Sequence, residues 1–318
     1  MSLAPFTLHA GATAVAVAYP QGAMVADMVL PRVPTDGQKF TYNVYNKADG
    51  YTVPETEVGR KGKPNEVEFG SSEETVSTID QAVDAPIPNA DIENFEASRR
   101  NGARTLVDPR LRATRGLTQV LLTRREKRVA DLVTNINSYG VDNRIVLSGT
   151  SQFSDYVNSD PDAVISEVLD NLFMRPTHLV MGRAVWSKLR RHPKIAAAVF
   201  KNGTNAGKVS LEQFAEHFEL PNLPIIGEGW LNVAQKGQPV NMQRIWGKDM
   251  LAFYQDMNAD PQFGITFGFT GQWGERIAGT IQDADMGMRG GQRMRVGESV
   301  KELIIAPDLA YLWKNAVA

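Results

Sequence analysis

The stretch DPRLRATRGLTQVLLTRREKRVADLVTNINSYG, residues 108 to 140, decides the fold. Asp108 can cap the start of a helix, and Pro109 suits its first position, where the missing N–H costs nothing. Gly140 tolerates the positive φ at which helices often end. Between these residues apolar side chains recur at steps of three and four, which predicts a helix over residues 109–139 with one apolar face. They are Leu117, Val120, Leu121, Val129, Leu132, Val133 and Ile136.

The expected helix is unusually long. About thirty residues at ~1.5 Å each span ~45 Å, whereas a compact chain of this size has a radius of gyration of only ~20 Å. A coiled coil is one alternative, but it needs sustained heptads. Arg124, Arg125, Lys127 and Arg128 interrupt the apolar seam. We therefore interpret the helix as a spine that carries separate layers on its flanks.

Composition excludes several classes of protein. The chain has 318 residues, a net charge of −2 and no cysteine, which rules out disulfides and thiolate chemistry. The near-neutral charge gives no global reason to expect nucleic acid or an acidic membrane as a partner. Residues 10–30 are apolar, but no Lys or Arg precedes Arg32, and Pro20 and Asp27 interrupt the run. We predict an extended arm there, not a secretory signal or a membrane span.

A polar excursion is expected between the arm and the spine helix. Residues 31–105 contain no Leu and no Met. Residues 40–45 alternate apolar and polar side chains as a strand does, and 65–69 are a second candidate strand. A two-stranded hairpin is marginal by itself in water, so we expect this one to lie on another surface. A linker or a disordered tract is the alternative.

Charge is divided into two adjacent blocks. Residues 66–96 hold nine acidic and no basic residues, whereas residues 99–128 hold ten basic and two acidic ones. Such runs are usually solvated faces. Opposite blocks can also pair between copies of a chain, which would make association salt-sensitive. On this hypothesis the inter-subunit contacts are Glu66, Glu68, Glu73, Glu74, Arg112, Arg115, Arg124, Arg125 and Arg128.

The rest of the chain alternates short helices and strands. Strands are expected at 144–147, 177–182, 223–226, 241–246 and 250–254, and helices from 161, 183 and 210. Ser210 can cap the last of these helices, with Gln213 in the capping-box position. Residues 263–274 and 286–297 are glycine-rich and are expected to form loops and hairpins, before a C-terminal core strand.

Signals of catalysis are weak. The sequence has no GxSxG, no HExxH and no pair of His residues four apart, so no catalytic, cofactor-binding or metal-binding residue is predicted. GTNAGK, residues 203–208, is too short between its glycines for a phosphate loop and is interpreted as a turn. The arginines around residues 289–295 are interpreted as a polar hairpin. An enzyme is not expected.

Four stretches, in this order, resemble tailed-phage major capsid proteins related to the lambda coat protein. They are SGTSQFSDYVNSDPDAVI from residue 148, THLVMGRAVWSKLRRHPKIAAAVFKNG from 177, PIIGEGWLNVAQKG from 224 and RIWGKDMLAFYQD from 244. The resemblance implies an α+β chain with the Hong Kong ninety-seven type fold. Its parts would be an N-terminal arm (1–36), an extended loop (37–87), a peripheral domain with the spine helix (88–182), an axial domain (183–285) and return strands (286–318).

The resemblance also implies a function. Such a chain would be a structural protein forming hexamers and pentamers of an icosahedral head, with the extended loop lying across a neighbouring subunit. It would belong to the virion, be assembled in the host cytoplasm, and enclose double-stranded DNA on its inner face without sequence specificity. Portal, scaffolding and decoration proteins would be its other partners. No long leader precedes the arm, so a scaffolding segment is expected to be a separate or removed chain. Two alternatives remain: an encapsulin-like compartment, and a nucleic-acid-binding protein that uses residues 99–128.

Overall fold

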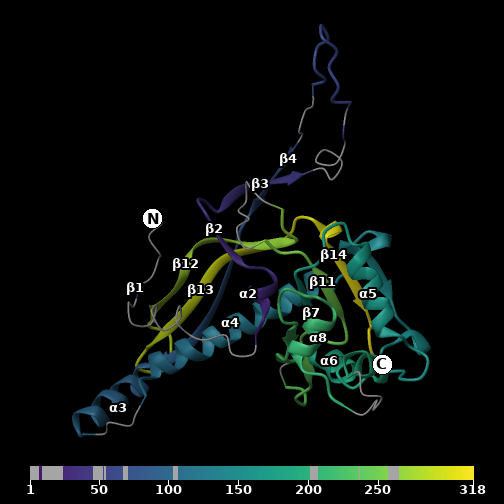
Figure 1. The fold of residues 1–318 in the computed structure, drawn as a ribbon. Helices are drawn as coiled ribbons and strands as arrows, with labels where there is room; N and C mark the ends of the chain where they lie inside the picture. Colours follow the sequence, from purple (N-terminus) through teal and green to yellow (C-terminus); the bar gives the residue numbers. More distant parts are fainter. Residues whose placement is uncertain are drawn as a thin grey trace.

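The computed structural model describes residues 7–8, 24–45, 53, 55–66, 71–102, 107–200, 207–235, 237–256 and 265–318. A long sheet lies against the spine helix α4, and a second sheet carries a group of shorter helices (Figure 1). A narrow two-stranded excursion projects from the body, on the side away from helix α3 (Asn89–Arg100). Among the described residues, no helix is long and apolar enough to span a bilayer.

The spine helix α4 runs from Pro109 to Val133. It starts as predicted, because the Asp108 side chain accepts a hydrogen bond from the Arg110 N–H at 2.8 Å. It ends six residues before the predicted 139. The Asn135 side chain accepts the Asn137 N–H at 3.0 Å and begins a separate 3₁₀ turn, η1 (Ile136–Ser138). The expected stop at Gly140 was wrong, since this residue has a φ of −59° and starts another turn, η2 (Val141–Asn143).

The long sheet supports one flank of the spine helix. Its order is β1-β12-β13-β5, and β2 pairs in parallel with β12. The strands are β1 (Thr7–Leu8), β2 (Arg32–Thr35), β5 (Ile79–Pro88), β12 (Gly268–Asp283) and β13 (Gly291–Ile304). Leu117 and Leu121 of α4 pack against a buried layer of this sheet that includes Ala278, Met294 and Val296. Full burial of a side chain as large as Leu or Met contributes roughly 1.5–3 kcal/mol to the stability of the fold.

Strand β12 corrects one prediction. Its first half lies in the glycine-rich stretch that was expected to form loops, of which residues 263–264 lie outside the described part. Glycine is needed at position 271 of this strand because the ring of Phe40 lies against it: a Cβ there would lie 2.4 Å from the Phe40 Cζ. Here glycine permits close packing within a strand, and does not mark a turn.

The second sheet has the order β6-β14-β11-β7-β8. Its strands confirm the short strands expected there, namely β6 (Arg144–Val146), β7 (His178–Gly182), β8 (Ile225–Gly227), β11 (Met250–Phe253) and β14 (Ala310–Lys314). Helices α5 (Pro161–Asn171), α6 (Arg183–Leu189), α7 (Pro193–Val199) and α8 (Leu211–His217) cover it. Ser210 and Gln213 form the capping box predicted for α8. Short 3₁₀ turns η3 (Gly149–Ser151) and η4 (Pro307–Leu309) complete this part.

Pairing and burial group the elements around the two sheets. Ile165 and Leu169 of helix α5 share a buried cluster with Trp186 and Trp313 of the second sheet and its helices. The terminal strand β14 joins the second sheet, whereas β5 and β12 belong to the long sheet. The domain ranges that the resemblance implies stay a prediction.

The excursion is built from β3 (Lys39–Tyr45) and β4 (Ser71–Ser77), which pair antiparallel. The strand predicted at 40–45 is confirmed, and its partner β4 begins at Ser71. Of the second candidate strand at 65–69, residues 65–66 are not in a strand and residues 67–69 lie outside the described part. At the base, Phe40 and Tyr42 are buried against Phe269 of β12. Residues 55–66 are exposed throughout and form the distant tip seen in Figure 1. Among the described residues of the excursion, those at its base therefore lie on another surface of the same chain, whereas residues 55–66 do not.

Candidate functional site: charged surfaces and the buried network of the spine helix

The predicted acidic contacts are mostly at the surface. Glu66, at the tip, is exposed and pairs with Lys63 at 2.5 Å. Glu73 is exposed on β4. Glu74 accepts a hydrogen bond from the Tyr42 hydroxyl at 2.5 Å, and burial together with this bond raises the pKa of Tyr42 to about 12. Glu68 lies outside the described residues.

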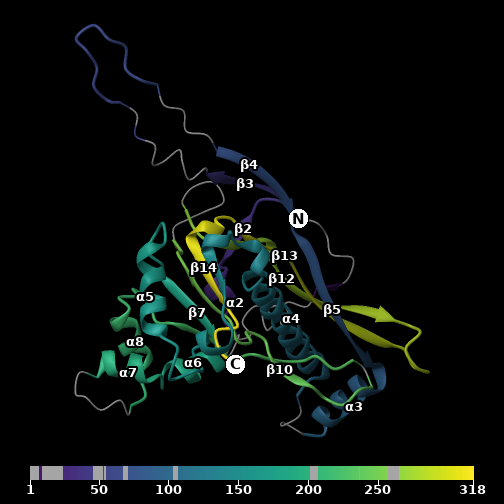
Figure 2. The ribbon, with the colours of Figure 1, turned by 90° about the vertical axis from the view of Figure 1, so that its right-hand side faces the viewer.

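The predicted basic contacts divide into two groups. Arg112, Arg115 and Arg124 of α4 are exposed. Arg128 is half-buried, and its guanidinium bonds Glu302 of the same chain at 2.8 Å. Figures 1 and 2 show β4 well away from α4, so one chain does not bring the acidic strand and the spine arginines together.

Arg125 corrects the prediction of an inter-subunit contact. Its side chain is only 1% exposed and forms an ion pair with Asp27 at 2.5 Å. Its Nη2 also donates to the Leu30 carbonyl and the Thr270 hydroxyl, both at 3.2 Å. Burial, reinforced by the neighbouring charge of Arg32, lowers the pKa of Arg125 to about 10. This residue joins segments of its own chain and is not available to a partner.

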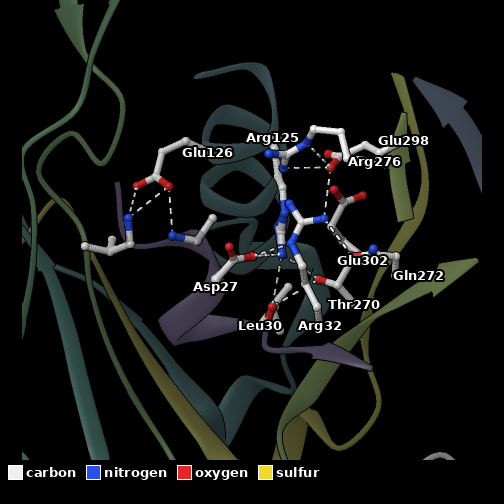
Figure 3. Close-up of polar contacts among 12 residues, drawn as sticks. Asp27, Leu30, Arg32, Arg125, Glu126, Thr270, Gln272, Arg276, Glu298 and Glu302 are labelled. Atoms are coloured by element: carbon white, nitrogen blue, oxygen red, sulfur yellow. Dashed lines mark hydrogen bonds and ion pairs between the residues drawn. The ribbon is translucent and has the colours of Figure 1, made fainter. Parts of the chain in front are cut away.

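A second set of charges continues the network (Figure 3). Arg32 of β2 bonds Asp27 at 3.0 Å and Glu298 of β13 at 2.9 Å. Arg276 of β12 bonds the same oxygen of Glu298 at 2.9 Å. Burial raises the pKa of Glu298, but the charges of Arg32 and Arg276 outweigh it and leave the pKa below its usual value. The buried carboxylate is thus held charged between two strands of the long sheet.

Glu126 lies on the other side of α4 from this cluster in Figure 3. Its carboxylate is fully buried and accepts the Val25 N–H at 2.9 and 3.0 Å, the Ala26 N–H at 2.8 Å and the Trp246 Nε1–H at 2.6 Å. Burial raises the pKa of Glu126, and these donors oppose the rise. Helix α2 (Ala26–Val29) is therefore fixed to the spine.

The helical period could have revealed this network. Leu121, Arg125 and Val129 are four residues apart, so they share one face of α4, and the first and last are apolar. The basic block was interpreted as one solvated surface, although its period divides it into a buried face and an exposed one. No sequence signal indicates that Asp27, Arg276 and Glu298, distant along the chain, are the partners.

Other polar groups form structural contacts. Arg293 and Arg295 pair with Asp283 and Asp84, so the predicted polar hairpin is confirmed. Of the GTNAGK stretch, residues 203–206 lie outside the described part. Within the described residues, no group of three or more His, Asp or Glu side chains could hold a metal ion.

Comparison with solved structures defines the class of protein. The fold matches a phage-related protein from Bordetella bronchiseptica with a TM-score of 0.74 and 17% identity, covering 98% of each chain. It also matches a virus-like particle from Pyrococcus furiosus with a TM-score of 0.56 and 12% identity, covering 96% of this chain and 97% of the other. The spine helix, long sheet, second sheet and excursion together form the Hong Kong ninety-seven type capsid fold, as predicted.

Sequence comparison then identifies the family. Residues 128–285 match the family described as phage major capsid protein E. The chain is 48% identical to a major capsid protein of Pseudomonas phage JBD67 over 100% of both sequences. The chain therefore belongs to the phage major capsid proteins. It is a structural component of the capsid of a tailed phage. The encapsulin-like and nucleic-acid-binding alternatives are not favoured.

Proposed function

We propose that this chain forms the hexamers and pentamers of an icosahedral head that encloses double-stranded DNA. Portal, scaffolding and decoration proteins would be further partners, and DNA would contact the inner face without sequence specificity. Assembly would take place in the host cytoplasm, and the chain would have no catalytic role. The membership of the family supports the shell itself, and the geometry of the chain supports the way in which copies join.

The excursion is the observation that carries this proposal. Its base buries Phe40 and Tyr42 against the long sheet, but residues 55–66 are exposed and lie well away from the body in Figures 1 and 2. A two-stranded hairpin of this kind is marginal in water unless another surface covers it. Stable interfaces bury ~1,200–2,000 Å² of total surface, which a long projecting limb can supply when it lies on a second copy. The tip is therefore proposed to contact a neighbouring subunit.

Charge would set the register of these contacts. The proposed acidic residues are Glu66, Glu68, Glu73 and Glu74, and the exposed basic residues left on the spine helix are Arg112, Arg115 and Arg124. Arg128 would contribute through the 19% of its side chain that is exposed, while Arg125 is removed from the set. Exposed charges are screened beyond a Debye length of ~8–10 Å at physiological salt, so this contribution would weaken as salt is added.

Assembly of the purified protein tests the proposal. Sedimentation and negative-stain microscopy should show uniform closed particles that become fewer as salt rises from about 0.1 to 1 M. Arg124→Glu should reduce particle yield, and adding Glu73→Arg should restore part of it. Arg191→Glu, an exposed arginine away from the spine, is the matched control and should leave assembly unchanged. A chain that stays monomeric at high concentration would contradict the shell. Particles indifferent to salt and to Arg124→Glu would contradict the charged contacts alone.

A further inference from the structure

A small hairpin beside the second sheet takes no part in the contacts described above. Strands β9 (Trp230–Asn232) and β10 (Met242–Arg244) pair only with each other among the described strands. Arg244 lies opposite Trp230, and Met242 lies opposite Asn232. Directly opposed residues share one face of a hairpin. Leu231 points to the other face and packs against the core beside the spine helix.

The outer face of the β9–β10 hairpin has the composition of a protein interface. Trp230 is 49% exposed and Met242 is 50% exposed, while Val240 in the connecting loop is 73% exposed. The Arg244 guanidinium lies 4.3 Å from the centre of the Trp230 ring. Trp, Met and Arg are enriched in interface cores, and Trp and Arg dominate the residues that contribute most binding energy. A face of this kind left in water suggests a protein partner.

Local hydrogen bonds fix the shape of the hairpin before any partner binds. The Asn232 Oδ1 accepts the Ala234 N–H at 3.1 Å and the Asn241 N–H at 3.0 Å. Gly237 adopts a φ of +90° in the connecting loop, a conformation that glycine reaches without strain. A preorganised loop loses little conformational entropy on binding, which favours affinity.

Charge indicates what would cover the hairpin. Residues 229–248 contain three basic and no acidic residues. The surface made by α5 and α8 has the opposite character, and we call it the α5–α8 face. Its carboxylates are Asp162, Glu167, Asp170, Glu212, Glu216 and Glu219. His217 joins the two helices through Asp162 at 2.5 Å, and Arg175 bonds both Asp170 and Glu219.

The two surfaces lie on different sides of the same chain. In Figure 2, α5 and α8 lie on the left of the second sheet, while β10 lies on its right. Complementary surfaces on opposite sides produce head-to-tail contacts, which close into rings when the rotation allows. We infer that the β9–β10 hairpin of one copy docks on the α5–α8 face of the next copy, with Trp230 and Met242 as the apolar centre and Arg244 opposite the carboxylates. This inference rests on the proposed self-assembly and adds the two surfaces that meet within a ring.

Crosslinking tests the contact directly, because the chain contains no cysteine. Met242→Cys combined with Glu216→Cys should give a ladder of covalently linked copies when assembled particles are treated with a short bismaleimide. Met242→Cys alone should give no ladder. Neither should Met242→Cys combined with Met288→Cys, which places the second thiol at the exposed turn between β12 and β13. Particles that form normally but yield no ladder from the first pair would overturn the inference.

Charge reversal gives an independent readout. Arg244→Glu should weaken subunit association by at least about tenfold, as expected for loss of a central interface arginine. Glu212→Arg with Glu216→Arg should do the same, and combining the three changes should restore assembly. Near-ultraviolet circular dichroism should confirm that each variant is folded. If Arg244→Glu assembles as well as the unmodified chain, the hairpin contact is wrong while the shell function stands. If the unmodified chain forms no particles, the proposed function fails, and the hairpin contact fails with it.

Discussion

Replacing Glu126 by Gln tests how the N-terminal segment is fixed to the spine helix. The two carboxylate oxygens accept four contacts, from the N–H groups of Val25 and Ala26 and from Trp246. An amide keeps one accepting oxygen and presents an NH₂ group in place of the other. Whichever way the amide turns, either the Ala26 N–H or the Trp246 N–H then faces a donor.

The magnitude follows from that count. A buried donor without an acceptor costs about 1–3 kcal/mol. The neutral amide also avoids the desolvation that raises the pKa of Glu126, which offsets part of the cost. We expect a net loss of about 2 kcal/mol in the free energy of unfolding. For a chain of this length, with an unfolding entropy of about 2.1 cal/mol/K per residue, this lowers the melting temperature by about 3 °C.

Scanning calorimetry of the dissociated subunit measures the change, and Trp246 fluorescence provides a local readout. Glu66→Gln is the matched control, because this carboxylate is exposed at the tip and its loss should change stability by no more than about 0.5 kcal/mol. A Glu126→Gln protein that melts at or above the melting temperature of the unmodified chain would show that the contacts of the Glu126 carboxylate do not stabilise the fold.

Three further predictions concern stability. Arg125→Ala removes one of the two guanidinium groups that pair with Asp27 and leaves a buried gap beside Thr270, so it should cost about 2–5 kcal/mol, or about 3–8 °C in melting temperature. The pKa of Glu298 is below its usual 4.5 in the folded chain, so the contribution of this carboxylate to stability should be full above about pH 4.5 and fall as the pH drops below that value. Melting curves from about pH 7 to 3 should show this fall, and Glu298→Gln should flatten it. Gly182→Ala should sharply reduce the folded yield, since a Cβ there would lie 2.2 Å from the Gly247 carbonyl oxygen. Gly116→Ala, in open space on the spine helix, should instead stabilise the fold by roughly 0.5–1 kcal/mol in thermal melts.

Local sequence patterns predicted much of the fold. Capping at Asp108 and Ser210, and alternation in residues 40–45, gave correct starts for two helices and one strand, because these signals act within a few residues. The spine helix ends before the predicted residue because the Asn135 side chain accepts the Asn137 N–H, which favours a turn over a further helical residue. The apolar period extends past this point, so the period alone predicted a longer helix. The first half of strand β12 was missed because Gly271 makes room for the ring of Phe40, which is distant along the chain.

The charged contacts show the same division. Exposure of Arg112, Arg115 and Arg124 agrees with a solvated face. Arg125 looked equivalent in the sequence, but its helical position turns it toward Asp27, about a hundred residues earlier. The apolar period of the helix could have indicated that Arg125 is buried, but its partner depends on tertiary pairing, which the pattern of charge along the chain does not encode.

Cryo-electron microscopy of particles assembled from the unmodified chain locates residues 55–66 and so shows whether the excursion joins neighbouring copies. We expect a closed shell in which this tip lies on a neighbouring copy, with its side chains covered there. A shell, or a lone subunit, in which the tip folds back onto its own body and touches no other copy would contradict this expectation.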